Sequence, residues 1–464
     1  MHCKYCAMVF PNEQYPLTES VEVIHRAGEK ETWRFHHNDK TKDQYYFEAR
    51  ARYFAKQYMA DRLLDMARVD ALSGDEAYGR RAALLLRRFA EVFPRWCVVH
   101  DYPSPDKKYP VNDAKPPYSY WAGIWDRWHL YDTPKQIALA YDLVYDQVDD
   151  ETRRMVENDL LRADVAFQRT YTGKLEPYNR VAPQRSAGFI LIGRVINEPD
   201  FVHEGVQRIG ELCAQDFHFD GMHRMGTPSY HIQMVNNCKI AAGYARGYSD
   251  PPGYGKGRFD DLDLLEEVAT LGMADMATKK MTLPNGLVVP VHDAWSRDRS
   301  HVLGEHALGP MLLNSYGHGR LDFGATQAHL NFSGGDGHRH FDNLSLILFA
   351  HGEELLSDIG YTHTPWRFWP TQSPSHNTVV VDGKLHHTET LGGNLRWFDA
   401  TGNVQVIEAS QPRTYPGVTD VFRRRLITVR VDETRAYVVD VFTVRGGAQH
   451  DYFLHGHCAK PQAA

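Results

Sequence analysis

Histidines and acidic residues cluster in one short stretch of the chain. Residues 334–342 read Gly-Gly-Asp-Gly-His-Arg-His-Phe-Asp, which places His338 and His340 one residue apart. An acid at Asp358 and a third histidine at His376 follow. Imidazole nitrogens together with a carboxylate oxygen are a ligand set that suits zinc and other divalent ions. These residue types and spacings therefore predict a metal site.

The spacing within this stretch also suits a β-strand. Side chains alternate between the two faces of a strand, so His338, His340 and Asp342 would share one face if a strand runs there. An isolated pair of this kind also fits one metal ligand beside one hydrogen-bonded core histidine. The later residues favour the metal site, because short strands would bring Asp358 and His376 back beside the pair.

The elements that must position these residues change in type along the chain. From about residue 43 to 277, apolar residues recur at helical spacing, which predicts helices stacked in pairs as an α/α toroid or solenoid. After about residue 283, alternating and β-branched runs punctuated by Gly, Asp and Asn predict a mostly antiparallel sheet region. The predicted helices cover residues 45–67, 76–93, 134–148, 151–167, 201–217 and 262–276. The predicted strands cover residues 326–332, 344–349, 377–381, 404–408, 426–431 and 436–444.

Length and composition limit the classes of protein. A chain of 464 residues with 42% hydrophobic residues can fill more than one core, and we expect two domains, residues 1–300 and 301–464. A net charge of -7 argues against a generic nucleic-acid binder, which needs a basic surface. No apolar run of about 18 residues predicts a membrane span, and the polar start lacks the apolar core of a secretory signal peptide. The scattered cysteines do not form a disulfide framework, and the single Cys3–Cys6 pair lacks the second pair that a zinc ribbon needs.

The second half resembles a known family. Three ordered motifs between Gly334 and Gly383 are similar to the sheet domain of the heparinase II/III-like polysaccharide lyases: residues 337–342, residues 358–361 (Asp-Ile-Gly-Tyr) and residues 376–383 (His-Asn-Thr-Val-Val-Val-Asp-Gly). The resemblance implies an N-terminal (α/α) toroid followed by a C-terminal antiparallel β-sandwich. The opening residues 2–12 resemble the middle of a longer N-terminal region in some relatives, so we expect both ends to be trimmed.

The first half carries a looser resemblance. Asp220-Gly221 followed by residues 226–231 is similar to the segment that supplies the family's catalytic tyrosine, which would be Tyr230. Asn179 stands where the family has an asparagine that binds the substrate carboxylate. Several relatives have a histidine directly after that asparagine, where this chain has Arg180. The proton-abstracting base would then be Tyr230, His231 or His338.

The resemblance implies cleavage of a uronic-acid glycan by β-elimination. Such a reaction removes the proton at C5 beside the carboxylate and expels the glycosidic oxygen at C4. Asn179, supported by Arg180 or Arg185, would stabilise the charge that builds on the carboxylate. Tyr230 would take the proton, helped by cations that favour its phenolate, and would return it to the leaving oxygen.

The resemblance also assigns the metal. His340, Asp358 and His376 would hold one structural zinc ion, which leaves His338 facing the substrate. Further substrate contacts are expected from Arg185, His231 and Arg339, and from aromatic rings that pack against sugars, among which we name Trp125 and Trp366.

Other functions stay open at this point. A glycoside hydrolase could use two carboxylates such as Asp220 and Asp293, a cupin-like metal oxidoreductase could hold iron with the same histidines, and a glycan-binding pseudoenzyme would follow if Arg180 has replaced the base. The expected partner is an acidic polysaccharide or oligosaccharide, and a homo-oligomer is left open. By resemblance alone, the expected location is periplasmic or secreted.

Overall fold

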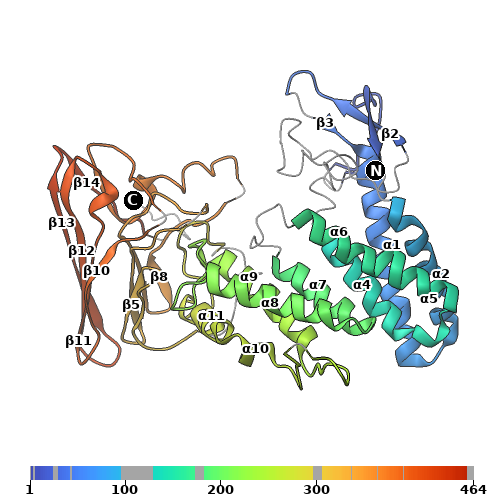
Figure 1. Cartoon of the computed structure of the whole chain (residues 1–464). Helices are drawn as coiled ribbons and strands as arrows, with labels where there is room; N and C mark the ends of the chain where they lie inside the picture. The colour runs from blue at the N-terminus through green and yellow to red at the C-terminus, as the bar shows by residue number, and fades with distance from the viewer. Residues whose placement is uncertain are drawn as a thin grey trace. The chain divides into compact units, whose positions relative to one another are not determined.

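The computed structural model describes residues 2–456 except for 4–5, 25–29, 42–43, 96–128, 173–181, 256, 296–305, 336, 363 and 390. The chain divides into two compact units (Figure 1). The first unit contains residues 1–210 and 238–264, and the second contains residues 211–237 and 265–464. The segment that carries Tyr230 therefore belongs to the same compact unit as the sheets.

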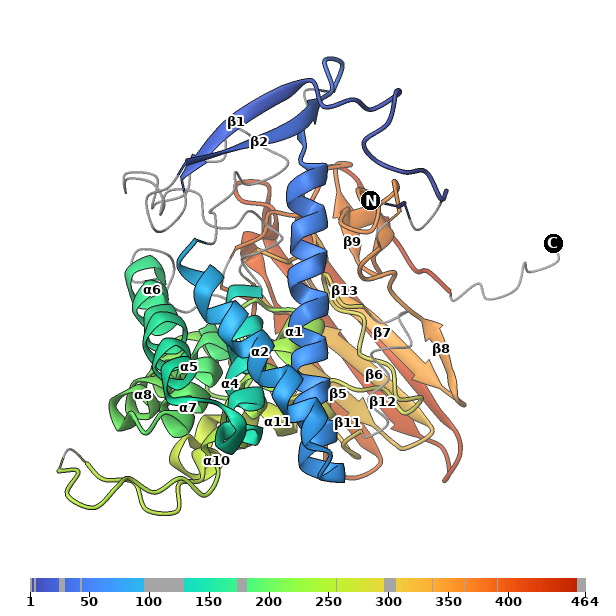
Figure 2. The ribbon, with the colours of Figure 1, turned by 90° about the vertical axis from the view of Figure 1, so that its right-hand side faces the viewer.

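The first unit is built mainly from helices. Its two long helices, α1 (Phe47–Ser73) and α2 (Glu76–Val92), lie side by side (Figure 2). Gly74 ends α1 in a left-handed conformation with φ of 71°, and the Asp75 side chain accepts a hydrogen bond from the Ala77 backbone at the start of α2. The helices that follow are α4 (His129–Leu143), α5 (Asp150–Arg154), a π-helical stretch η4 (Met155–Arg162), α6 (Ala163–Thr172), α7 (Ala182–Val195) and α8 (Pro199–Asp216).

One apolar core joins these helices. Buried residues such as Leu63, Leu86, Tyr141, Leu160 and Phe189 belong to a single cluster that draws on α1, α2, α4, η4 and α7. A small antiparallel sheet precedes the helices, with strands β1 (Glu19–Ile24), β2 (Lys30–His37) and β3 (Gln44–Tyr45). Paired antiparallel helices around a shared core are the arrangement that the apolar periodicity predicts.

The second unit contains two larger antiparallel sheets. Sheet A has the order β4 (Met311–Leu313), β5 (His318–Asp322), β6 (Thr326–Asn331), β7 (Ser345–Ala350) and β8 (Glu353–Leu356). Sheet B has the order β10 (Asn394–Asp399), β11 (Val404–Ser410), β12 (Thr419–Arg430) and β13 (Ala436–Gly446). A short pair, β9 (Val379–Val381) and β14 (His450–Tyr452), completes the described strands.

Sheets A and B pack face to face as a sandwich. Leu330 and Leu346 of sheet A share one buried cluster with Ile407, Phe422 and Leu426 of sheet B. Burial alternates along β12, as expected when one face of a strand meets a core and the other meets solvent. The alternating pattern in the sequence is therefore the direct cause of this packing.

Sheet A is also covered on its other face. The segments α9 (Pro228–Ala245), α10 (Leu264–Glu267) and α11 (Ala269–Lys280) flank it in sequence. Met222 and Ala277 pack with Ile347 and Phe349, which point away from the sandwich core. Because both faces are covered, β5 and β6 are buried at every position. The turn before α9 therefore lies against the loop between β6 and β7, which carries His338 and His340.

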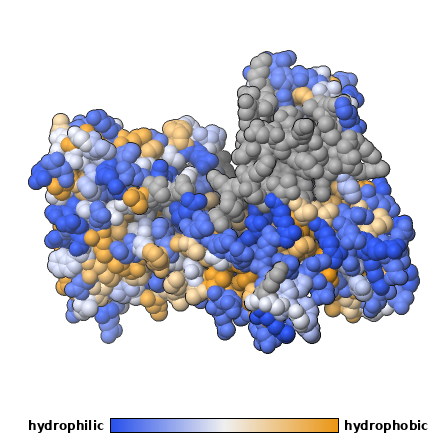
Figure 3. Space-filling view, in the orientation of Figure 1, coloured by the Kyte–Doolittle hydropathy of each residue, from blue (hydrophilic) through white to orange (hydrophobic). Residues whose placement is uncertain are grey.

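The outer surface mixes polar and apolar residues over the face that Figure 3 displays. Among the described helices, none combines the length and apolar character that crossing a membrane requires.

Candidate active site

Two aromatic rings from distant parts of the sequence stack on each other. The rings of Tyr230, in the first turn of α9, and His338 have centroids 3.9 Å apart and planes inclined by 21°. The approach depends on Gly226, whose φ is +74° and whose added Cβ would lie 2.7 Å from the Gly334 carbonyl oxygen. Only a glycine fits this contact without a backbone shift. The turn before α9 is thereby fixed against the loop that carries His338.

The loop between β6 and β7 is not a strand. No described residue from 332 to 344 has strand conformation, so the condition under which His338, His340 and Asp342 would share one strand face is not met. Gly337 and Leu344 have positive φ values of 93° and 56°, which break the pleat that would place alternate side chains on one face. Asp342 pairs instead with His292, since its Oδ2 lies 3.0 Å from the Nδ1 of that ring.

One buried carboxylate joins the two histidines of the loop. Oδ2 of Asp293 lies 2.9 Å from Nδ1 of His338, and Oδ1 lies 3.0 Å from Nε2 of His340. The guanidinium of Arg367 lies 3.2 Å from the same Oδ2. Burial alone would raise the pKa of Asp293, but hydrogen bonds from His338 and His340 and the charge of Arg367 hold this pKa well below its usual range. Asp293 is therefore an anion in the folded protein.

The three predicted metal ligands lie together. His340, Asp358 and His376 are all buried, and each offers a ligand atom within 4.8 Å of the other two. Asp358 Oδ2 lies 2.5 Å from His376 Nδ1. Burial would lower the pKa of His376, but the Asp358 carboxylate raises it above its usual value.

Two ring nitrogens of this cluster lack partners. Nδ1 of His340 and Nε2 of His376 are buried and accept or donate no hydrogen bond within the described part of the chain. A buried polar atom without a partner is destabilising unless something else binds it. Two imidazoles and one carboxylate, with unpartnered nitrogens, fit a zinc ion.

The remaining predicted contacts in this unit have different surroundings. Arg339 donates to the Gly335 carbonyl oxygen at 2.8 Å, within its own loop. Trp366 is 69% exposed. His231 is fully buried, its Nε2 lies 2.9 Å from the Ala274 carbonyl oxygen, and its Nδ1 accepts from the His223 backbone. The ring of His231 is thus used for packing and has no free nitrogen for a substrate.

The predicted residues of the first unit are only partly described. Arg185 is buried within α7. Asn179, Arg180 and Trp125 lie outside the described residues. Their roles stay predictions.

The two carboxylates of the hydrolase alternative have other uses here. Asp220 accepts from the Tyr316 backbone at 2.9 Å and caps the turn at Met222. Asp293 is held as an anion by two histidines. A hydrolase needs one protonated carboxyl group as its acid, so this pair does not fit that reaction.

Asp293, Arg367 and His292 were the site residues that sequence reasoning did not recognise as part of the histidine cluster. Asp293 lies 45 residues before His338 in the sequence, next to His292, and Arg367 lies in the loop after β8. The available signal was the His292-Asp293 pair directly after the apolar run 287–291.

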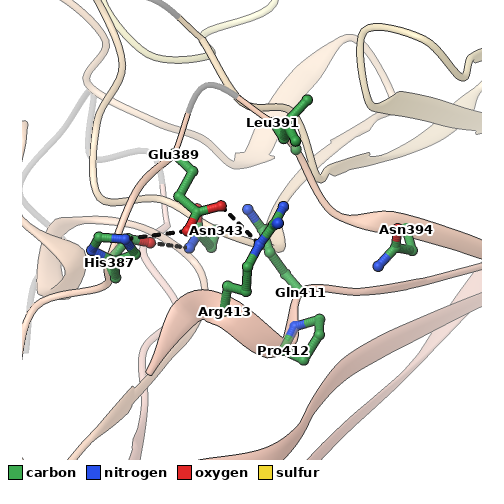
Figure 4. Close-up of a pocket in the computed structure, with 9 residues that line it drawn as sticks. Asn343, His387, Glu389, Leu391, Asn394, Gln411, Pro412 and Arg413 are labelled. Carbon is green, nitrogen blue, oxygen red and sulfur yellow. Dashed lines mark hydrogen bonds and ion pairs between the residues drawn. The ribbon is translucent and has the colours of Figure 1, made fainter. Parts of the chain in front are cut away.

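A separate small polar pocket, open to solvent, lies beside sheet B (Figure 4). The Arg413 side chain pairs with Glu389 at 2.8 Å, and Asn343 donates to the His387 carbonyl oxygen at 2.8 Å. Neither Tyr230 nor any residue of the histidine cluster lines this pocket. The candidate active site is therefore the stacked pair and its carboxylate.

Part of this chain is similar in sequence to known proteins. The sequence profile of the heparinase II/III-like C-terminal domain matches residues 314–462. An alginate lyase from Stenotrophomonas maltophilia (strain K279a) is 29% identical over 146 residues, which are 26% of this chain and 20% of that protein. An exo-oligoalginate lyase from Saccharophagus degradans (strain 2-40) is 29% identical over 212 residues, which are 39% of this chain and 27% of that protein. The chain thus aligns with about a fifth to a quarter of the length of these curated relatives.

Solved structures share the fold. Heparan sulfate lyase HepC from Pedobacter heparinus superposes with a TM-score of 0.61 at 17% identity, over 82% of this chain and 61% of that one. The heparinase III-BT4657 gene product gives a TM-score of 0.59 at 18% identity, over 83% of this chain and 64% of that one. The predicted fold class, an (α/α) toroid followed by an antiparallel β-sandwich, is confirmed. Residues 314–462 thus match the heparinase II/III-like C-terminal domain, and the chain shares its fold with solved heparinase structures.

Proposed function

We propose that this protein is a polysaccharide lyase that cleaves a uronic-acid-containing glycan by β-elimination. The observation that carries the proposal is the stack of Tyr230 on His338, with the imidazole held by an ionised Asp293. The two aligned relatives are named as alginate lyases, which supports the same class of reaction. An acidic polysaccharide or oligosaccharide is the proposed partner.

Each residue has a defined task in this reaction. The Tyr230 phenolate removes the C5 proton, and the phenol formed in this way donates that proton to the leaving C4 oxygen. His338, stacked on that ring, orients the phenol and donates or accepts a hydrogen bond at its outer nitrogen. Asn179 and Arg180 are proposed to neutralise the substrate carboxylate, because donors to that group stabilise the negative charge that builds up on it. Trp366, Trp125, Arg339 and Arg185 are proposed to contact the sugars on either side.

His340, Asp358 and His376 are proposed to hold one structural zinc ion. Two nitrogens, one oxygen and the unpartnered buried ring atoms support this assignment. An ion held by these three residues would join the loop after β6, the segment after β8 and the segment before β9. His340 and, through the backbone, His338 would then be held in place.

Polymeric uronates are too large to cross a membrane unaided, so we place the activity in the periplasm or outside the cell.

The alternative function, a metal oxidoreductase, would require iron with open coordination positions at His340, Asp358 and His376. Metal analysis of the purified protein distinguishes this iron site from the proposed zinc site.

Incubation with a panel of uronate polymers tests the function. Elimination yields a conjugated double bond that absorbs ultraviolet light, and mass spectrometry identifies the fragments. We expect absorbing products from alginate, heparan or a related uronate polymer. Fragments without this absorbance would indicate a hydrolase, and tight binding without any fragment would indicate a pseudoenzyme.

A further inference from the structure

Asp293 contacts two histidines that have different predicted tasks. One carboxylate oxygen faces the ring that stacks on Tyr230, and the other faces the ring that belongs to the metal cluster. All these residues lie in the second compact unit. The side chain of Asp293 is 7% exposed, so water competes little for either oxygen.

An ionised carboxylate determines which nitrogen of each ring carries the proton. It can only accept hydrogen bonds, so the nitrogen that faces it must donate. His338 therefore carries a proton on Nδ1, and His340 carries one on Nε2. In the neutral rings, the lone pairs are then on Nε2 of His338 and on Nδ1 of His340.

An independent observation agrees with this assignment for His340. Its Nδ1, the nitrogen that would keep the lone pair, is the one that is buried without a partner in the described part of the chain. A metal ligand must present a lone pair. Nδ1 of His340, which does not face Asp293, is thus the nitrogen that can bind an ion.

The backbone beside Asp293 is arranged for this double contact. His292 has a φ of +55°, a left-handed conformation that residues with a side chain rarely adopt. The His292 ring is anchored by Asp342 on one side and by the Ser333 hydroxyl, 2.9 Å from Nε2, on the other. The Asp293 backbone N–H donates to the His338 carbonyl oxygen at 3.2 Å. The strained turn therefore directs the Asp293 carboxylate to both rings.

We propose that Asp293 is a positioning residue that sets the tautomers of His338 and His340 together and so links the substrate-facing imidazole to the metal site. This proposal rests on the proposed function for the task of His338, and on the proposed zinc site for the task of His340. The Arg367 guanidinium also lies 3.2 Å from Oδ2 of Asp293, the oxygen that faces His338.

The tautomers can be measured without any variant and without metal. In metal-free protein with ¹⁵N-labelled histidines, long-range proton–nitrogen correlation NMR should show the His340 proton on Nε2 and the His338 proton on Nδ1. The opposite tautomer at either ring would overturn the proposal. Assignment comes from the spectra of the His338→Gln and His340→Gln variants.

The substitution Asp293→Asn provides the second test. The amide oxygen of asparagine can accept a hydrogen bond from one ring, but the amide nitrogen donates a hydrogen bond to the other ring. The nitrogen of that second ring must then accept, so its proton must move to the opposite ring nitrogen. We expect zinc affinity or kcat to fall at least about tenfold while KM changes little, because remote carboxylate partners of metal-bound histidines have effects of that size. Unchanged zinc affinity together with unchanged kcat would contradict the proposal.

A matched variant controls for the loss of a buried carboxylate. Asp322→Asn removes a buried carboxylate of the same unit that contacts Gln327 and Arg320 and neither histidine. It should leave the histidine spectra, the zinc affinity and kcat unchanged. The protein could lack lyase activity on every uronate and still show the expected tautomers and a zinc affinity that Asp293→Asn lowers. That combination would refute the proposed function, but the role of Asp293 at His340 would stand.

Discussion

The imidazole of His338 and the phenol ring of Tyr230 lie 3.9 Å apart, centroid to centroid, although 108 positions separate them (338 - 230 = 108). Their contact joins the first turn of α9 to the loop after β6. The stack holds the phenol ring beside the imidazole, and the proposed elimination depends on this placement.

Replacing Tyr230 by phenylalanine should abolish turnover. The variant keeps the stacked ring and loses only the hydroxyl that moves the proton, so we expect kcat to fall by at least about 10²–10⁴-fold with little change in thermal stability. Ultraviolet detection of unsaturated products gives the rate. Tyr437→Phe, at a half-exposed ring on β13, is the matched control and should keep full activity. Substantial activity in Tyr230→Phe would remove the phenol from the mechanism.

Chelation should destabilise the protein. If the buried cluster holds zinc, removal leaves unpartnered ring nitrogens inside the unit, and we expect the Tm to fall by at least about 5 °C. Differential scanning calorimetry with and without chelator measures the shift. The Asp358→Asn variant should have a lower Tm that chelator no longer changes. The His338→Gln variant should still show the fall in Tm on chelation. A protein that contains no metal when purified, and that chelator leaves unaltered, would argue against the zinc site.

Substitution of Gly226 should affect both stability and activity. Gly226→Ala adds a Cβ 2.7 Å from the Gly334 carbonyl oxygen and requires a left-handed conformation. We expect a loss of about 1–3 kcal/mol in the free energy of unfolding and a lower kcat, because the Tyr230 turn must move away from the His338 loop. Urea unfolding and steady-state rates measure the two effects.

The control for this substitution is Gly402→Ala in the turn between β10 and β11. Gly402 has a similar φ of +71°, but nothing lies within 4 Å of its added Cβ. The Gly402→Ala variant should lose stability only because of its backbone conformation, and its kcat should equal that of the wild-type protein. Equal kcat in the two variants would mean that the close approach of Gly226 does not position the site.

Acid should destabilise the second unit through His231. Burial lowers the pKa of His231 from 6.5 to about 4, so the folded state holds the neutral ring. Because the unfolded chain binds the proton more readily, this contribution to stability is complete above about pH 6.5 and is lost as the pH falls toward 4. We expect the free energy of unfolding to drop by on the order of 1–2 kcal/mol between pH 7 and 5 from this group.

The measurement is urea unfolding across that pH range, in wild-type protein and in a variant without the imidazole. His231→Phe should flatten part of the slope, whereas replacing the exposed His351 should not. A slope that is the same in all three proteins would show that the burial of His231 has no effect on acid stability.

Amphipathic and alternating patterns allowed most elements to be predicted. Helices α1, α2 and α8 and strands β6, β7, β11 and β13 lie where the apolar spacing placed them. Helices α7 and α9 were missed, because nearly all residues of α7 from Ala182 to Gly193 are buried and no polar face marks its period. A helix that is apolar all round gives no periodic signal.

The site was predicted in part for a similar reason. His340, Asp358 and His376 could be grouped because their types and motifs suggest ligands, and the structure brings them together. Asp293 could not be assigned, since it is one of 59 acidic residues and only the turn at His292 aims it at the two rings. The loop conformation of 332–344 depends on positive φ at Gly337 and Leu344, which side-chain alternation does not reveal.

Cleavage in H₂¹⁸O tests the central claim most directly. The protein is incubated with a uronate polymer in labelled water, and the fragments are weighed by mass spectrometry. Elimination adds no water across the bond, so we predict unsaturated fragments without ¹⁸O at the new ends, and no such fragments from Tyr230→Phe. Saturated fragments that contain one labelled oxygen per cleaved bond would contradict the proposed reaction.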